Sequence, residues 1–174
     1  METTEKIVEA YVRYVKGWAT IPNIKCPGQY EIDLLAINPV TLDRYHIESG
    51  ISISGSYSKL TSRPFSDQDL KIRVKTAGQR RTLGYFIERK FGAEPILNTL
   101  KRYGFFNGKY KKIIVSWDWE GGLADEAAKQ NIELWDFRKM LIEIGNILKT
   151  GKTYFTDDTL RTLQVYSKAT TKLK

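Results

Sequence analysis

The sequence predicts an α/β sandwich in which helices cover both faces of a central mixed sheet. Short β-rich runs alternate with helical patterns along the chain. The first two predicted strands are close enough in sequence to form an antiparallel hairpin, whereas a helix separates the later strands, as in parallel connections. A composition of 41% hydrophobic and 12% aromatic residues over 174 positions is sufficient for the core of one compact domain.

The chain is expected to begin with a helix over residues 4–18, because apolar side chains recur there at helical spacing on one broad stripe. Gly17 and Pro22 end this pattern. Residues 21–28 contain two prolines and are interpreted as a connection.

Residues 30–38 and 45–54 are predicted to be the two strands of a hairpin, joined by a four-residue loop at 39–42. In this register Asp33 faces Glu48, and facing side chains are about 5 Å apart at Cβ. A loop shifted by one residue would send the two carboxylates to opposite faces of the sheet.

Beyond the hairpin, residues 55–70 are polar and turn-rich and are expected to form a loop. The order of elements is then α-β-β-α-β-α-β-α. Residues 1–148 are assigned to the α/β domain and residues 149–174 to a basic C-terminal helical extension of the same domain. The later elements are helices at 79–90 and 93–103, a strand at 111–117, a helix at 122–130, a strand at 132–135 and helices at 138–148 and 158–166.

Positive charge is concentrated in one part of the chain. Residues 71–112 contain twelve Lys or Arg and two acids, whereas the rest of the chain is close to neutral. This asymmetry favours a polyanionic partner such as nucleic acid, with a solvated basic face as the alternative. The residues expected to contact phosphates are Arg80, Arg81, Lys109, Lys111 and Lys112.

Residue content excludes several function classes. A single cysteine, Cys26, rules out an internal disulfide and a cysteine-based zinc site. The one histidine, His46, lies in a predicted strand with no nucleophile suggested nearby, and neither a P-loop nor a dinucleotide fingerprint is present. No run approaches the roughly 18 apolar residues that span a bilayer, and the polar N-terminus is unlike a secretory signal. A cytoplasmic protein that does not bind membranes is expected.

The candidate site is formed by three acids, Glu9, Asp33 and Glu48. Two carboxylates that face each other across a hairpin repel unless a cation lies between them. Mg²⁺ or Mn²⁺ takes such ligands together with water and phosphate oxygens, and can activate water for phosphodiester hydrolysis. The alternative is that Glu31, Asp33 and Glu48 form the solvated face of an amphipathic hairpin.

The order of these features resembles the restriction-endonuclease-like, or PD-(D/E)XK, nucleases. A leading helix with a glutamate is followed by residues 28–33 (GQYEID) and by a strand ending in residues 45–48 (YHIE). Residues 113–136, with a strand, an Ala-rich helix and a strand, are similar to the closing β-α-β unit of that family. The resemblance covers roughly residues 5–148. It implies a restriction-endonuclease-like fold in which Asp33 and Glu48 hold a divalent metal and Glu9 assists.

The sequence departs from the family at one position. The family usually has Glu-x-Lys on the second strand, whereas residues 48–50 are ESG. Some members of the family supply the cation from elsewhere, and the candidates here are Lys59 and Lys90. A literal Glu-x-Lys at residues 88–90 falls in a predicted helix and is interpreted as helix rather than catalytic strand.

Three hypotheses follow. The first is a divalent-metal-dependent DNA endonuclease that uses Asp33, Glu48 and either Lys59 or Lys90. The second is a catalytically decayed nuclease fold that binds nucleic acid without cleaving it. A lysine nitrogen within about 3–4 Å of the acidic pair separates these two. The third is an α/β domain whose basic surface binds an acidic protein. The resemblance also implies a homodimer as one option.

Overall fold

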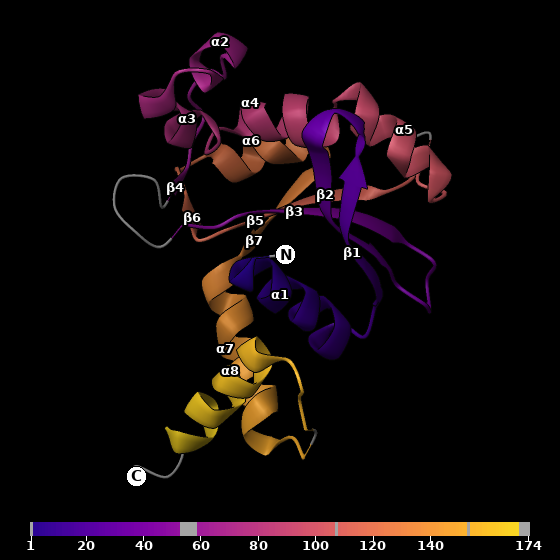
Figure 1. Cartoon of the computed structure of the whole chain (residues 1–174), viewed down its shortest axis with the longest axis vertical. Coiled ribbons are helices and arrows are strands. Elements are labelled where there is room, and N and C mark those ends of the chain that lie inside the picture. Colours follow the sequence, from indigo (N-terminus) through magenta and orange to yellow (C-terminus); the bar gives the residue numbers. More distant parts are fainter. Residues whose placement is uncertain (1, 53–58, 107, 153, 171–174) are drawn as a thin grey trace.

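The computed structural model of the chain describes residues 2–52, 59–106, 108–152 and 154–170. It contains a five-stranded sheet in the order β1-β2-β3-β5-β7 (Figure 1). Neighbours are antiparallel from β1 to β3 and parallel from β3 to β7. The predicted mixed sheet of an α/β fold is therefore confirmed. Its strands are β1 (Ala19–Cys26), β2 (Tyr30–Ile37), β3 (Arg44–Gly50), β5 (Lys111–Ser116) and β7 (Ile132–Asp136).

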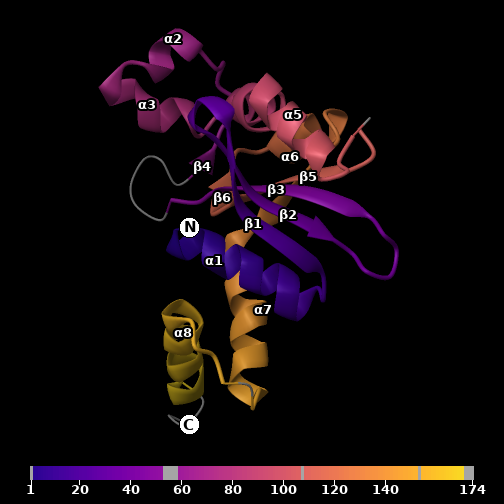
Figure 2. The same ribbon diagram turned by 45° about the vertical axis from the view of Figure 1, so that its right-hand side comes forward.

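Helices cover both faces of the sheet (Figure 1, Figure 2). α1, its π-helical continuation η1 and α7 lie on one face, whereas α4, its π-helical continuation η4, α5 and α6 lie on the other. α8 packs against α1 and α7. The bounds are α1 (Thr3–Ala10), η1 (Tyr11–Val15), η2 (Pro27–Gln29), α2 (Asp67–Leu70), α3 (Arg73–Gln79), α4 (Leu83–Tyr85), η4 (Phe86–Phe91), α5 (Glu94–Arg102), α6 (Leu123–Lys129), α7 (Phe137–Thr150) and α8 (Asp158–Ala169).

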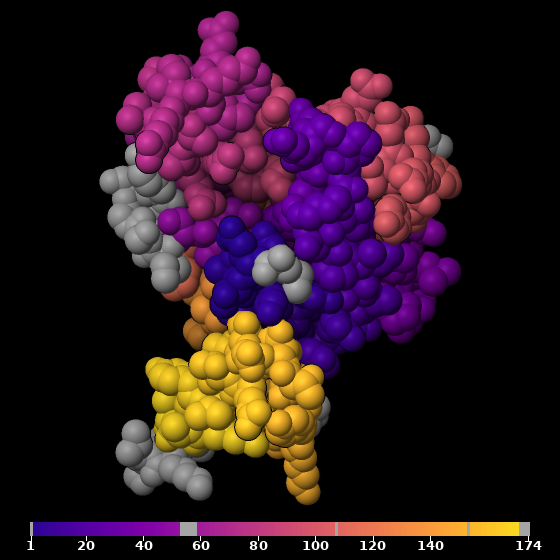
Figure 3. Space-filling view, viewed as in Figure 1, coloured from indigo at the N-terminus to yellow at the C-terminus, as the bar shows by residue number. Residues whose placement is uncertain are grey.

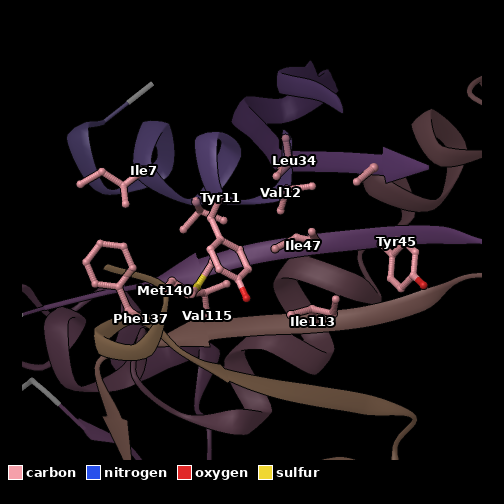
Figure 4. Packing of buried hydrophobic residues seen from close by; sticks show 12 residues of the cluster. Ile7, Tyr11, Val12, Leu34, Tyr45, Ile47, Ile113, Val115, Phe137 and Met140 are labelled. Carbon is pink, nitrogen blue, oxygen red and sulfur yellow. The ribbon is translucent and has the colours of Figure 1, made fainter. Parts of the chain in front are cut away.

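The largest core cluster lies between the sheet and the helices α1, η1 and α7 (Figure 4). Val12 from the N-terminal helix and Ile47 and Ile113 from the sheet are fully buried in it. On the opposite face, Phe86 and Phe91 of η4 pack with Ile114. Burial of each such side chain stabilises the fold by about 1.5–3 kcal/mol, which fixes α1 and η4 against opposite faces of the same strands.

The interpretation of residues 21–28 as a connection is wrong. Most of this segment belongs to β1, which begins at Ala19 and pairs with β2 along its length. Pro22 is tolerated because β1 is an edge strand, where a missing N–H does not interrupt a second ladder. The first helix correspondingly ends at Val15, and Trp18 stacks on Tyr45 with ring centroids 4.0 Å apart.

Two further boundaries differ from expectation. The expected loop at 55–70 contains the short strand β4 (Lys59–Leu60), which pairs with β6 (Asp118–Trp119) in a second small sheet, and it ends in α2. Residues 53–58 lie outside the described ranges. The helix expected at 79–90 begins only at Leu83, because the Thr82 side chain caps its first turn by accepting a hydrogen bond from Tyr85 N–H. Among the described residues, no helix is both long and apolar enough to cross a membrane.

Candidate active site

The predicted hairpin register is confirmed, and it brings Asp33 and Glu48 together. The β2–β3 ladder runs from the pair Ile37–Arg44 to the pair Leu34–Ile47, directly before the two acids. At the two acids, hydrogen bonds to side chains take the place of the backbone hydrogen bonds between the strands. Asp33 N–H donates to Glu48 Oε1 at 3.3 Å. Both carboxylates therefore lie between the two strands, each held by the opposite one.

The neighbouring strand confirms that β2 is irregular at Asp33. Pairing with β1 skips Asn23 and Asp33, and Asn23 has a left-handed φ of 54°. Ile32 and Leu35, an odd number of residues apart, pack in one apolar cluster. The normal alternation of the strand is thus broken at the acid, although the register with β1 is the same on both sides of it.

Lys90 supplies the cation that the strand lacks. Its Nζ lies 2.9 Å from Asp33 Oδ1 and 2.5 Å from Glu48 Oε2. Lys90 belongs to η4, and Phe86 and Phe91 of the same helix pack against the sheet. A lysine nitrogen within 3–4 Å of the pair was the feature expected to separate the first two hypotheses, and Lys90 meets it.

The local packing explains why the lysine comes from a helix. Gly50 is buried at the third position of the strand triplet, where the PD-(D/E)XK pattern that the sequence resembles has its lysine. A Cβ built at Gly50 would lie 2.6 Å from Phe86 Cζ, a contact that real Cβ atoms essentially never make. The Phe86 ring therefore occupies the space that a side chain at Gly50 would need, and Lys90, one helical turn further on, reaches the acids instead.

His46 contacts the carboxylate oxygen of Glu48 that Lys90 does not contact. Its Nε2 lies 2.7 Å from Glu48 Oε1, and both side chains are fully buried. Burial lowers the pKa of His46 to about 3, so the ring is neutral at pH 7 and its Nε2 proton can be donated to the carboxylate. The other ring nitrogen, Nδ1, has no hydrogen-bond partner in the described part of the chain. Glu48 is thus clamped between a neutral imidazole and the Lys90 ammonium group.

Burial dominates the electrostatics of the pair. It raises the pKa of Glu48 to about 7, against the attraction of Lys90. Burial and then repulsion by Glu48 raise the pKa of Asp33 to about 6. Burial alone would lower the pKa of Lys90, but the two carboxylates raise it well above its usual range. Strongly perturbed pKa values in one cluster are typical of functional sites.

A third acid approaches Asp33 from α1, and it is Glu5 rather than Glu9. Carboxylate oxygens of Glu5, Glu31 and Asp33 lie within 4.8 Å of one another, close enough to share a metal ion. Burial, followed by repulsion from Asp33 and Glu31 among others, raises the pKa of Glu5. Glu9 lies one helical turn away on α1, where its Oε1 accepts a hydrogen bond from Thr20 Oγ1 at 3.0 Å, and the structure does not bring it into this cluster.

Two other expected site residues serve different contacts. Lys59 is paired with Asp118 at 3.5 Å on the small second sheet, so it does not replace the missing strand lysine. Arg81 is half-buried, and its guanidinium donates to the backbone oxygen of Ile51 at 3.1 Å. Arg81 therefore holds the end of β3 in addition to contributing charge.

A cavity of about 290 Å³ lies beside the acidic pair, although Asp33 and Glu48 are buried and do not line it themselves. Glu31 and Lys90 line it from the site, and Arg80 and Arg89 add two further cations. In Figure 3 it is the hollow between the tip of the β1–β2 hairpin and the α2–α3 segment, with η4 at its floor. The expected phosphate contact at Arg80 is therefore placed beside the candidate catalytic residues.

The remaining predicted phosphate contacts lie at the start of β5. Lys111 pairs with Asp43 at 3.6 Å and covers the Tyr45 ring. Lys112 lies over the ring of Phe91, and burial lowers its pKa. Both face the end of β3 where the strand begins, not the end that leads to the acidic pair. Together with Lys109, which precedes β5, they stay predicted nucleic-acid contacts outside the site.

The comparisons with known proteins do not identify a family. A scan against protein-family models finds no match, and a search of curated proteins finds none either. Among solved structures, the chain is similar to the crystal structure of a protein of unknown function, AF1548. The two chains share 11% identity with a TM-score of 0.46, over 97% of this chain and 98% of that one. Similarity at this level carries no functional assignment, so the function has to be inferred from the residues of the site.

Proposed function

We propose that this protein is a divalent-metal-dependent endonuclease of the restriction-endonuclease-like type, acting on DNA. The observation that carries the proposal is the contact of Lys90 Nζ with both Asp33 and Glu48, at 2.9 and 2.5 Å. An acid pair and a lysine are the groups that this family uses for phosphodiester hydrolysis. Here they meet at the point where two strands part, beside a cavity with further cations.

The donor set fits Mg²⁺ or Mn²⁺. Both ions prefer carboxylate oxygens and keep several water ligands, and the oxygens of Glu5, Glu31 and Asp33 lie within 4.8 Å of one another. Like charges at this separation favour a bound cation. When bound, such an ion supplies Lewis acidity to the phosphodiester and to water. Asp33 belongs to both the lysine-linked pair and this acidic cluster, so it is the central ligand.

The protein's own groups have distinct roles. Lys90 carries a positive charge in a largely buried position, where it can stabilise negative charge that develops on a phosphate. Glu48 holds Lys90 in place and is itself oriented by His46. Arg80 and Arg89 line the adjoining cavity and can bind the phosphates next to the cleaved bond.

A second function, nucleic-acid binding without cleavage, is favoured by one observation. Glu48 is fully buried, and Lys90 and His46 occupy its two oxygens. A metal ligand needs a free oxygen, so Glu48 can join a metal only if Lys90 or His46 moves. The non-enzymatic alternative predicts salt-dependent binding with no cleavage in any divalent metal.

A cleavage assay separates the two functions. Supercoiled, linear, single-stranded and branched DNA are incubated with Mg²⁺ or Mn²⁺ and with wild type, Asp33→Asn or Lys90→Met. A matched control is Asp125→Asn, an exposed acid on α6. We expect cleavage by wild type and the control and none by the other two variants. Binding without cleavage by wild type would instead establish the alternative. Equal cleavage by all four proteins would refute the assigned site.

A further inference from the structure

Arg81 is a half-buried cation without an acidic partner. All Asp and Glu side chains of the chain lie within the described ranges, and none forms an ion pair with Arg81 within 4.0 Å. Among the described residues, its side chain donates one hydrogen bond, to the backbone oxygen of Ile51. A guanidinium group has five N–H donors, so most of them have no partner within the described part of the chain. Partial burial of an unpaired charge costs free energy that a bound anion would offset.

The Arg81 side chain lines a cavity of about 370 Å³ between β4 and α3. Three more cations line the same cavity, namely Lys59, Arg63 and Lys75, and no carboxylate does. The hydroxyl-bearing residues Thr61 and Thr82 complete its polar wall, with the two backbones joined by a bridge. This cavity differs in charge from the one beside the acidic pair, which contains Glu31 as well as cations.

We propose that the cavity between β4 and α3 is a phosphate-binding pocket that receives the nucleic-acid backbone away from the cleaved bond. Arg81 forms the inner contact, and Arg63 and Lys75 form the outer one. The ion pairs of Lys75 with Asp69 at 2.9 Å and of Lys59 with Asp118 at 3.5 Å involve partly exposed groups. Such pairs are weak enough to exchange for a phosphate.

The position of the pocket favours a nucleic-acid strand over a free anion. Arg80 and Arg81 are adjacent in the chain, yet Arg80 lines the cavity beside Lys90 and Arg81 lines this one. Arg81 also touches the strand end just after Glu48, since its NH1 would lie 3.2 Å from a Cβ at Gly50. The two cavities therefore lie on either side of one short segment, so one nucleic-acid strand that runs past this segment could contact both. The inference builds on the proposed function in taking nucleic acid as the source of the phosphate.

The test measures binding of a short fluorescein-labelled DNA duplex by fluorescence anisotropy, in EDTA and over a range of salt concentrations. The pocket variant is the double substitution Arg63→Ala and Lys75→Ala, in two exposed residues. The control variant is Lys139→Ala with Lys149→Ala, which removes the same charge from exposed positions on α7. Inorganic phosphate is added as a competitor in a separate series.

Each lost phosphate contact lowers the salt slope by about 0.9 on duplex DNA, so two lost contacts reduce affinity by up to about 60-fold at 0.1 M salt. We expect this loss in the pocket variant and an unchanged slope in the control variant. Equal losses in the two variants would overturn the pocket, because charge alone would then explain binding. Absence of binding by wild type would overturn it too. Competition by inorganic phosphate as effective as by unlabelled DNA would show a free-anion site and refute the nucleic-acid pocket.

Because binding is measured in EDTA, the outcome is independent of cleavage. If the wild type never cleaves DNA and the pocket variant binds DNA weakly, the proposed nuclease activity is refuted but the phosphate pocket is supported. If the wild type cleaves DNA and the pocket variant binds DNA normally, the phosphate pocket is refuted but the nuclease activity is not.

Discussion

Asp33→Asn should stabilise the folded protein in the absence of metal, although it removes an ion pair. Burial and the Glu48 carboxylate raise the pKa of Asp33 from 3.8 to about 6, even with Lys90 beside it. The charged form is therefore disfavoured in the folded state. Since one pKa unit corresponds to about 1.4 kcal/mol, the free energy of unfolding should rise by up to about 3 kcal/mol when the charge is removed.

The sign of the pH dependence follows from the same shift. With a folded pKa above the unfolded one, the wild-type protein loses stability as pH rises from about 4 through about 6. Asparagine has no such titration. The advantage of the variant should be close to zero below the unfolded pKa, about 1.6 kcal/mol at pH 5 and about 3 kcal/mol at pH 8.

The assay is urea unfolding of both proteins in EDTA at the two pH values, followed by the same measurement with Mg²⁺. Metal should stabilise the wild type by mass action and leave Asp33→Asn unchanged, because the central ligand is gone. A variant that is less stable than wild type at pH 8 in EDTA would refute the reasoning. It would mean that the Lys90–Asp33 ion pair outweighs the cost of burying the charge and is chiefly structural.

Three further predictions concern the neighbours of the pair. Lys90→Met should reduce the rate of DNA cleavage at least 100-fold, because the charge that stabilises the phosphate is lost. DNA binding in EDTA, measured by anisotropy, should fall only slightly, because the variant removes one charge of the basic face. Glu5→Gln should weaken Mn²⁺ binding in calorimetric titrations about 10-fold or more, whereas Glu9→Gln should not, because only Glu5 contacts the acidic cluster. His46→Leu should lower the free energy of unfolding in EDTA by about 1–3 kcal/mol, as measured by urea unfolding, because it takes a hydrogen-bond partner from the buried Glu48 carboxylate, and His46→Gln, which keeps an N–H donor, should restore part of it.

Much of the fold could be predicted because its signals are local. A four-residue loop and two β-rich runs specified the hairpin register, and that register alone placed Asp33 beside Glu48. β1 was missed because Pro22 lies within it and Pro27 directly follows it, and because an edge strand tolerates a proline that a sequence pattern treats as a strand breaker. The register is decided by neighbouring residues, whereas the role of an edge strand is decided by what it lies against.

The site was less predictable because tertiary packing decides which side chains converge. Glu5 and Glu9 are one helical turn apart on α1, and no pattern in the sequence states which turn of the helix crosses the end of β2. Glu31 lies two residues from Asp33 and so could be expected on the same face. The contact of His46 with Glu48 has the same two-residue spacing on β3. Strand periodicity could have found these two, but not the acid on α1.

The choice between Lys59 and Lys90 depends on Phe86. Because that ring fills the space above Gly50, the strand cannot carry a lysine, and the cation has to come from the helix that carries the ring. This has a consequence for function. Arg80, Arg81 and Lys90 lie within one short stretch of chain, so the segment that lines both basic cavities also delivers the candidate catalytic lysine. A strand lysine would be fixed by the sheet, whereas Lys90 depends on how η4 packs. If the proposed function holds, contacts of DNA phosphates with Arg80 and Arg81 would act on the same segment that positions Lys90 between the two acids.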